Sequence, residues 1–299
     1  MSVHSSVQKK DLNIEREESK TPLRFVTAAS LFDGHDAAIN VMRRMIQNAG
    51  AEVVHLGHNR SVEEVVRAAI QEDADAVAIS SYQGGHMEYF RFMRHCLDEQ
   101  GGGHIKILGG GGGTITPQEI AQLESEGITK IYHPNDGMTP GLEGMIDDLI
   151  ARAQQDRMAP TQRLEVTKDS DIAVAQMISL IEEGKIDGSD SSGPHQAWMS
   201  KSTQTPVLGI TGTGGAGKSS TVDEFLRRFL HQRHDMRIAV LAVDPTRRRT
   251  GGALLGDRIR MNSLISSNIY MRSIAMRRQR VSTNQMLGDI TLFLKIIRL

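Results

Sequence analysis

The chain has 299 residues, a length that suits about two domains. Hydrophobic residues make up 39% and charged residues 24% of it, as in globular proteins that fold in water, and its formal net charge is −1. Its only cysteine, Cys96, excludes an internal disulfide and favours a reducing compartment. No run approaches the roughly 18 apolar residues of a membrane span, and the start lacks the apolar core of a secretory signal. We therefore expect a cytoplasmic protein without a membrane span.

The charge is unevenly distributed along the chain. Residues 237–299 contain 12 Lys and Arg against 3 Asp and Glu, whereas the residues before them are acidic overall. A basic segment can bind nucleic acid, but the phosphates of a nucleotide or of coenzyme A, or a docking face, account for it equally well. Because no aromatic residues interleave with the basic ones to stack on bases, we expect no nucleic-acid partner.

Five β/α units are expected in the first half of the chain, after a polar, disordered lead-in over residues 1–22. Ser61 with Glu64 forms a capping box, and Thr116 followed by Pro117 is typical of a helix start. Short connections between such units predict a parallel sheet covered by helices on both faces, with the flavodoxin-like strand order. The expected strands are residues 24–29, 52–56, 76–80, 105–108 and 130–132, and the expected helices begin near Asp36, Ser61, Gly85, Thr116 and Gly141.

The remaining residues are expected to form a linker and a second α/β domain. The first domain should end at residue 154, and residues 155–204 contain one helix, about residues 171–183, and a linker-like stretch at 189–194. The second domain should begin at residue 205. Its expected elements are a short buried strand at 206–211, a helix from Ser219 to Leu230, a strand at 237–243 and an apolar, helix-like tail at 286–299.

A phosphate-binding loop is expected between that first strand and its helix. The run from Gly212 to Ser219 fits the pattern G-x-x-x-x-G-K-[ST] at every fixed position. Backbone N–H groups and the positive end of the helix can then face phosphates. In this motif the lysine, here Lys218, reaches the β- and γ-phosphates, and the hydroxyl, here Ser219, binds Mg²⁺. A merely flexible glycine loop is the alternative. The expected nucleotide-binding residues are Gly212, Gly214, Gly215, Ala216, Gly217, Lys218, Ser219 and Ser220.

Three loops that follow strands of the first domain carry unusual residues. They are Asp33 to Asp36, which contains His35, then Ser80 to His86, and the glycine run Gly109 to Gly113. Because ligands of open α/β sheets bind beyond the carboxyl ends of the strands, these loops should line one site. A histidine flanked by carboxylates suits metal ligation, although a single histidine can also be a capping or surface residue. A phosphoacceptor receiver domain shares this topology, but its acidic cluster is missing here.

These three loops resemble the cobalamin-binding domain of the adenosylcobalamin-dependent acyl-CoA mutases, whose signature is Asp-x-His-x-x-Gly, then Ser-x-Leu, then Gly-Gly. Ala38 stands where the signature has glycine, and Tyr82 where it has leucine. The resemblance implies that His35 is the lower axial ligand of cobalt and that Asp33 is its hydrogen-bond partner. It also implies that the displaced nucleotide tail of the cofactor lies in a slot beside the other residues. The residues that match the signature are Asp33, His35, Ser80, Gly112 and Gly113, and Tyr82 is expected beside the tail.

A second resemblance concerns the residues beyond the phosphate loop. Val243-Asp244-Pro245 at a strand end and Leu255-Gly256-Asp257 resemble the GTPase chaperones of the acyl-CoA mutases. The resemblance implies that Asp244 and Asp257 serve the Mg²⁺ site, with Asp244 and Lys218 acting in catalysis, although Asp244 could simply be a turn residue. Residues 247–249, three arginines, lie in the implied switch region. The chain contains no Asn-Lys-x-Asp motif, so the sequence does not decide whether the nucleotide site prefers guanine or adenine.

Together the two resemblances imply a mutase that carries its GTPase chaperone in the same chain. Such enzymes interconvert isobutyryl-CoA and n-butyryl-CoA by a radical rearrangement, use adenosylcobalamin, Mg²⁺ and GTP, and form homodimers. Their acyl-CoA site lies in a barrel domain that this sequence lacks, and the resemblance ends after about residue 278, so we expect an incomplete P-loop domain. The alternatives are a non-enzymatic cobalamin carrier or sensor with a degenerate nucleotide-binding half, and an unrelated flavodoxin-like domain joined to a P-loop fragment.

Overall fold

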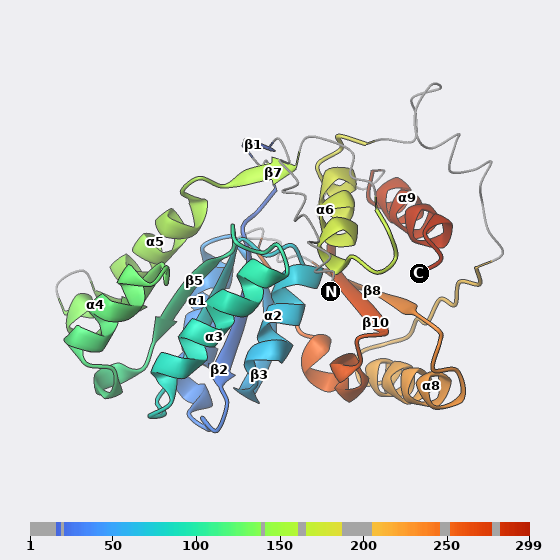
Figure 1. Cartoon of the computed structure of the whole chain (residues 1–299). Coiled ribbons are helices and arrows are strands. Elements are labelled where there is room, and N and C mark those ends of the chain that lie inside the picture. Colours follow the sequence, from blue (N-terminus) through green and yellow to red (C-terminus); the bar gives the residue numbers. More distant parts are fainter. Residues whose placement is uncertain are drawn as a thin grey trace, which may run out of the picture.

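The computed structural model describes residues 16–18, 21–138, 141–160, 166–186, 205–245, 252–276 and 282–299. A twisted parallel sheet with helices on both faces dominates one side of the molecule, and a smaller group of helices and strands adjoins it (Figure 1). Most of the lead-in expected over residues 1–22, the linker-like residues 189–194 and the arginines at 247–249 lie outside the described residues.

The flavodoxin-like sheet predicted from the sequence is confirmed. Hydrogen bonding gives the strand order β6-β5-β4-β2-β3-β9, and all neighbours are parallel. When the strands β2 to β6 are numbered 1 to 5 along the chain, their order in the sheet is 2-1-3-4-5, read from β3 to β6. Strand β2, in the interior of the sheet, is buried along its whole length. After Arg24 its sequence is therefore a continuous run of apolar and small residues, without alternation of apolar and polar ones. The five strands are β2 (Arg24–Ser30), β3 (Glu52–Arg60), β4 (Ala76–Ser80), β5 (Lys106–Gly110) and β6 (Lys130–Tyr132).

Helices cover both faces of this sheet, as expected. Side chains of β2 divide between two cores, with Val26 on one face and Phe25 on the other, because successive residues of a strand point in opposite directions. Both expected caps are present as full capping boxes, at Ser61 and at Thr116. One face is covered by α2 (Val62–Gln71), α3 (His86–Glu99) and α4 (Pro117–Ser125), and the other by α1 (Asp36–Asn48) and α5 (Gly141–Gln154).

The residues after 205 form a smaller α/β part. Helix α8 (Lys218–Gln232) follows the glycine run, and β8 (Ile238–Pro245) pairs in parallel with β10 (Ile269–Met276), a strand that the sequence analysis did not predict. The strand expected at residues 206–211 is wrong. These residues form no strand, and Val207 and Leu208 are 63% and 72% exposed. A strand needs a partner edge, and none of the described strands pairs with this segment.

Two connections join this part to the first sheet. Strand β9 (Ala253–Leu255) extends the sheet by pairing with β3. Helix α6 (Asp171–Glu182), which the sequence places in a linker, shares a core with β10 and with α9 (Ser282–Ile296). The apolar tail predicted at 286–299 is therefore helical over most of its length. A short antiparallel pair, β1 (Arg16–Glu18) with β7 (Met158–Pro160), lies beside these elements. No described helix is long and apolar enough to cross a membrane.

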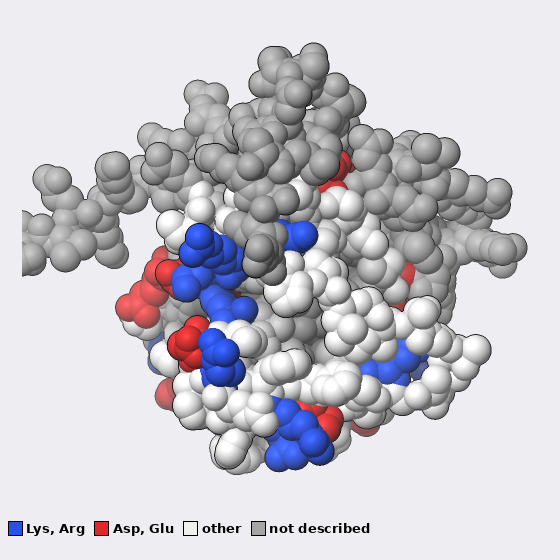
Figure 2. Space-filling view, turned by 90° about the vertical axis from the view of Figure 1, so that its right-hand side faces the viewer, with Lys and Arg blue, Asp and Glu red and all other residues white. Residues whose placement is uncertain are grey.

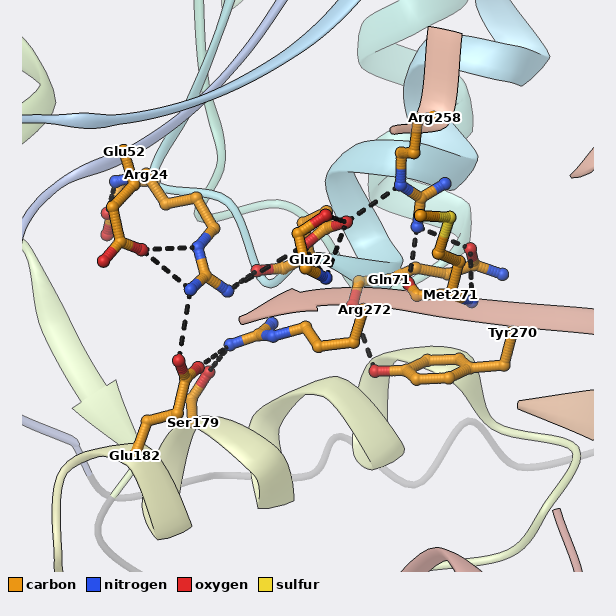
Figure 3. A network of polar contacts seen from close by, with 12 residues as sticks. Arg24, Glu52, Gln71, Glu72, Ser179, Glu182, Arg258, Tyr270, Met271 and Arg272 are labelled. Atoms are coloured by element: carbon orange, nitrogen blue, oxygen red, sulfur yellow. Dashed lines mark hydrogen bonds and ion pairs between the residues drawn. The ribbon is translucent and has the colours of Figure 1, made fainter. Parts of the chain in front are cut away.

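A buried network of charges lies where the two parts meet, at the amino-terminal edge of the sheet (Figure 3). Arg24, at the start of β2, is 4% exposed and donates to Glu52 Oε2, at 2.8 Å from Nη2, to the Glu72 carbonyl oxygen and to Glu182 Oε1 on α6. Burial alone would lower the pKa of Arg24, but the surrounding carboxylates of Glu182, Glu52 and Glu72 raise it well above its ordinary value. The guanidinium is therefore fully charged in the interior.

Glu72 is the member of this network that contacts the second part most extensively. Its carboxylate is fully buried and accepts hydrogen bonds from Arg258 Nε at 2.8 Å, and from the backbone N–H and hydroxyl of Ser273 at 3.0 and 2.9 Å. Arg258 also donates to Gln71 Oε1 at 2.9 Å, while Arg272 on β10 contacts Glu182 of α6. Carboxylates of one part thus neutralise arginines of the other.

The network predicts a large cost for neutralising Glu72. Glu72→Gln preserves the shape of the side chain but leaves two buried arginines short of a counter-charge, so we expect the unfolding free energy to fall by about 3 kcal/mol. The measurement is urea denaturation of the purified chain followed by circular dichroism. Glu126→Gln, which breaks the exposed Arg91–Glu126 pair, is the matched control and should cost less than about 1 kcal/mol. Equal losses in the two variants would contradict the role given to the network.

Candidate functional site

The loop after β2 brings Asp33 and His35 together. Asp33 is fully buried, and its Oδ1 accepts from the backbone N–H of His35 and from His35 Nδ1, both at 2.8 Å. Its Oδ2 accepts from the backbone N–H of Tyr82 at 2.8 Å, which ties the loop after β2 to the loop after β4. The sequence prediction that Asp33 is the hydrogen-bond partner of His35 agrees with this geometry.

The electrostatics of this pair favour an ionised carboxylate beneath the imidazole. Burial alone would raise the pKa of Asp33, but the hydrogen bonds from Tyr82 and His35 hold it below its ordinary value. With Nδ1 donating to Asp33, the lone pair of His35 lies on Nε2. The ring is 70% exposed, so this nitrogen is accessible to a ligand at the carboxyl edge of the sheet.

The other two predicted loops adjoin this histidine. The ring of Tyr82 lies 5.4 Å from that of His35, centroid to centroid, and is tilted by 42°. Gly112 has φ +60°, and a Cβ there would lie 2.7 Å from Tyr82 Cε1. Gly113 has no atom of another described residue within 4 Å of the position of a Cβ, so it is open. The aromatic ring at the position of the signature leucine therefore packs on the first glycine of the pair.

The residues present fit a long polar ligand beside the histidine. Ser80 is 7% exposed, and its Oγ has no hydrogen-bond partner among the described residues, although a buried hydroxyl normally has one. Gly111 belongs to the predicted glycine run but not to the residues matched to the signature, and a Cβ there would lie only 1.8 Å from the carbonyl oxygen of Ser81. The hydroxyl of Ser81 accepts a hydrogen bond from that of Ser30, Oγ to Oγ at 2.9 Å. Glycine at 111 therefore brings the third loop close to the second, and Ser80, with its unpartnered hydroxyl, is the last residue of β4 (Ala76–Ser80).

The phosphate-loop residues form a turn that leads into α8. Gly215 and Gly217 have φ +79° and +78°, conformations that favour glycine, and Cβ atoms at either would meet no described atom within 4 Å. Lys218 Nζ donates to the carbonyl oxygens of Gly212 and Thr213, both at 2.9 Å. The lysine thus folds over the loop that it is predicted to serve. Gly214 is also open, Ala216 donates its N–H to Thr213, and Ser220 is an exposed residue on α8.

The two predicted magnesium-site aspartates lie near the loop. Asp257 Oδ1 accepts from Ser219 Oγ at 2.9 Å. Burial, and then the charge of Asp257, raise the pKa of Asp244 to about 6, and Asp244 Oδ2 has no hydrogen-bond partner among the described residues. The described residues contain no group of three or more His, Cys, Asp and Glu side chains that could hold a metal ion. A P-loop Mg²⁺ does not need one, because it takes one or two protein oxygens together with phosphate and water.

The surface on the side of α8 carries no continuous basic area among its described residues. Figure 2 shows the Lys and Arg side chains of this side in separate groups, several of them beside Asp or Glu. On α8 itself, Arg227 and Arg228 both pair with Glu224. Within the basic segment 237–299, Arg237, Arg258 and Arg272 form ion pairs with carboxylates of the protein.

Two family models match the chain. The B12 binding domain matches residues 23–142, and the methylmalonyl-CoA mutase-associated GTPase MeaB matches residues 174–293. The second match begins within α6, so this helix falls inside the residues that resemble the GTPase.

Curated relatives match the two parts together. The chain is 54% identical over 279 residues to the fused isobutyryl-CoA mutase of Cupriavidus metallidurans, covering 92% of the chain and 25% of the relative. It is 52% identical over 277 residues to that of Geobacillus kaustophilus, covering 90% and 26%. The 2-hydroxyisobutanoyl-CoA mutase small subunit of Aquincola tertiaricarbonis is 33% identical over 112 residues, covering 38% of the chain and 81% of the relative.

The chain spans about a quarter of the length of the fused relatives. Within that length it contains the B12-binding domain and the MeaB-type P-loop GTPase residues in one α/β structure. Over about nine tenths of its own length the chain is therefore similar to the fused isobutyryl-CoA mutases.

Proposed function

We propose that this chain binds adenosylcobalamin through His35 and a guanine nucleotide through the phosphate loop, as the cofactor-holding portion of a fused isobutyryl-CoA mutase. The observation that carries the proposal is the buried Asp33 carboxylate, which fixes the exposed imidazole of His35 at the carboxyl edge of the sheet. A carboxylate in this position orients a ligating imidazole and increases its basicity. Residues 23–154, 155–204 and 205–299 are the proposed cobalamin, linker and GTPase segments.

The protein's own contribution is to bind and orient the cofactor. When bound, the cobalamin supplies homolysis of its cobalt–carbon bond, which generates the radical for rearrangement. His35 would ligate the cobalt through Nε2, and Asp33 would retain the proton on Nδ1. Ser80, Tyr82, Gly112 and Gly113 would line the slot for the nucleotide tail, where the unpaired Ser80 hydroxyl can donate or accept one hydrogen bond.

The nucleotide half of the proposal rests on the phosphate loop and its two aspartates. Lys218 would exchange its contacts with the loop carbonyls for the β- and γ-phosphates, and Ser219, Asp244 and Asp257 would hold Mg²⁺. In this proposal GTP binding and hydrolysis control the loading and protection of the cobalamin. The alternative, a cobalamin carrier or sensor with a degenerate nucleotide half, is favoured by one observation, which is that the segment before the loop forms no strand.

The reaction proposed for the whole enzyme is the interconversion of isobutyryl-CoA and n-butyryl-CoA. We place the acyl-CoA site outside these 299 residues. The chain spans about a quarter of the relatives' length, and the two domains matched within it are a B12-binding domain and a GTPase. A homodimer, a cytoplasmic location and the absence of nucleic-acid and membrane partners complete the proposal. The buried, unpaired Cys96 fits a reducing compartment.

His35→Ala should abolish axial ligation by the protein. We expect adenosylcobalamin added to the wild-type chain to give the visible spectrum of a base-off, histidine-ligated cobalamin, and this spectrum should be lost in the variant. Asp33→Asn should weaken binding by about 10- to 100-fold, since it removes the carboxylate that orients the ligand. His95→Ala, at a comparably exposed histidine on α3, is the control and should bind like the wild type. An unchanged spectrum in His35→Ala would exclude His35 as the ligand.

The raised pKa of Asp244 predicts that Mg²⁺ binding depends on pH. At pH values below its pKa of about 6, the Asp244 carboxyl must lose a proton before it can coordinate the ion. The affinity for Mg²⁺ should therefore rise as the pH passes through this value. We expect Mg²⁺ to bind the GTP-loaded chain about tenfold more weakly at pH 5 than at pH 7, since each pH unit below the pKa costs up to a factor of ten. Fluorescence of a labelled GTP during Mg²⁺ titration measures it.

Two variants test the assignment of that pH dependence. Asp244→Asn should bind Mg²⁺ more weakly at pH 7 and should lose most of the dependence between pH 5 and pH 7. Asp235→Asn removes an exposed carboxylate that pairs with Arg233 and should keep the wild-type profile. If Asp244→Asn retains the full profile, another group is responsible and Asp244 is not a ligand. If GTP and Mg²⁺ do not bind at all, the carrier or sensor alternative is favoured.

A further inference from the structure

The loop that presents His35 begins with a backbone outlier. Ser30 to Asp33 form a turn closed by the N–H of Asp33, which donates to the carbonyl oxygen of Ser30 at 3.0 Å. Its third residue, Phe32, has φ +63°, in the left-handed region that glycine or asparagine normally occupies. A bulky side chain is strained in this conformation, and such strain persists only where the surroundings impose it.

Two side chains from neighbouring loops hold the backbone of Phe32. The Phe32 N–H donates to Asn59 Oδ1 at 2.8 Å, and Gln83 Nε2 donates to the Phe32 carbonyl oxygen at 2.5 Å. Asn59 lies near the end of β3 and Gln83 in the loop after β4, so the strands on either side of β2 each contribute one contact. Asn59 itself has φ +55°, which asparagine tolerates.

Packing does not explain the strained turn. The side chain of Phe32 is 77% exposed, so no core holds the residue in place. Both polar groups of its backbone are bonded to side chains instead. Together with the hydrogen bond that closes the turn, these two contacts favour the left-handed conformation over a relaxed one.

The conformation of Phe32 determines where the carboxylate of Asp33 lies. Asp33 is the next residue, and its two oxygens accept from His35 N, His35 Nδ1 and Tyr82 N, each at 2.8 Å. Three bonds of normal length to one buried carboxylate tolerate little displacement. A turn that relaxed at Phe32 would move Asp33, and the imidazole of His35 would move with it.

We propose that Asn59 and Gln83 are positioning residues for His35, and that they act through the backbone of Phe32 to hold the Asp33–His35 pair in the orientation that ligates cobalt. The identity of the ligand rests on the proposed function, whereas the positioning itself concerns the protein alone. Each side chain bonds the backbone of Phe32, so its effect on His35 is indirect.

The first measurement follows the ligand-free chain. The N–H of His35 donates to Asp33, so its hydrogen exchange, followed by NMR, reports on the pair, whereas that of Phe32 changes trivially when its own acceptor is removed. We expect His35 to exchange about three- to tenfold faster in Asn59→Ala and in Gln83→Ala, the effect of one lost hydrogen bond. Asn59→Asp retains an acceptor oxygen and should restore slow exchange.

The second measurement adds adenosylcobalamin to the same variants. Asn59→Ala and Gln83→Ala should bind it about three- to tenfold more weakly, with a smaller fraction in the histidine-ligated spectrum, and Asn59→Asp should behave like the wild type. Phe32→Gly accepts the left-handed conformation without strain, so Asn59→Ala should have less effect in that background. Gln100→Ala, at the exposed C-terminus of α3 on the opposite edge of the sheet, is the matched control and should change neither measurement.

The outcomes separate positioning from general stability. Faster exchange at His35 with an unchanged urea midpoint supports the proposal, and rescue by Asn59→Asp supports it further. Unchanged exchange at His35 in both alanine variants overturns it, even if Phe32 itself exchanges faster. If the wild-type chain binds no cobalamin, the proposed function is wrong, and the exchange of His35 still decides whether Asn59 and Gln83 position it.

Discussion

The buried carboxylate of Glu72 is the interaction on which the arrangement of the two parts depends. It lies just after α2, beside the amino-terminal edge of the sheet, and accepts from Arg258 and Ser273 of the second part. A buried ion pair contributes little net stability against an apolar alternative, but a single unpaired member is costly. The network therefore specifies which surfaces meet. A docking that buried Glu72 without Arg258 opposite it would leave the carboxylate without this counter-charge.

Placing these charges at the amino-terminal edge leaves the carboxyl edge for ligands. The loops after β2, β4 and β5 meet there because all the strands are parallel, and one further buried carboxylate, Asp33, organises them. Asp33 differs from Glu72 in its donors, which are two backbone N–H groups and one imidazole rather than guanidinium groups. The charge of Asp33 is thus stabilised by hydrogen bonds without a permanent cation. Because only Nδ1 of the imidazole contacts Asp33, the other ring nitrogen is left for a ligand.

The parts of the structure that local sequence determines were predicted well, and those that depend on distant partners were not. The five strands of the first sheet and both capping boxes follow from short patterns, whereas the pairing of Asp33 with His35 was implied by the resemblance of their loop to a family signature. Strand β9 has only three residues and joins the sheet of the other part, which no local period can indicate. Residues 206–211 have strand-like composition but no strand to pair with among those described, and here the local prediction was wrong. The roles of Asn59 and Gln83 could not be predicted from the sequence, because their contacts with Phe32 join segments that are distant in the sequence.

The short segment after β9 links the phosphate loop to the first part of the molecule. Asp257 accepts from Ser219 of the phosphate loop, the next residue, Arg258, is bonded to Glu72 and Gln71 inside the first part, and Ile259 packs on Gly57 of β3. Gly57 has φ +88°, and a Cβ there would lie 2.7 Å from Ile259 Cδ1, so glycine is needed at this contact. Because a buried guanidinium with three bonded partners is hard to displace, Asp257 has little freedom to move independently of the sheet. The position of Asp257 is therefore set by side chains of the B12-binding domain, and β3 of that domain also carries Asn59, which bonds the turn before His35.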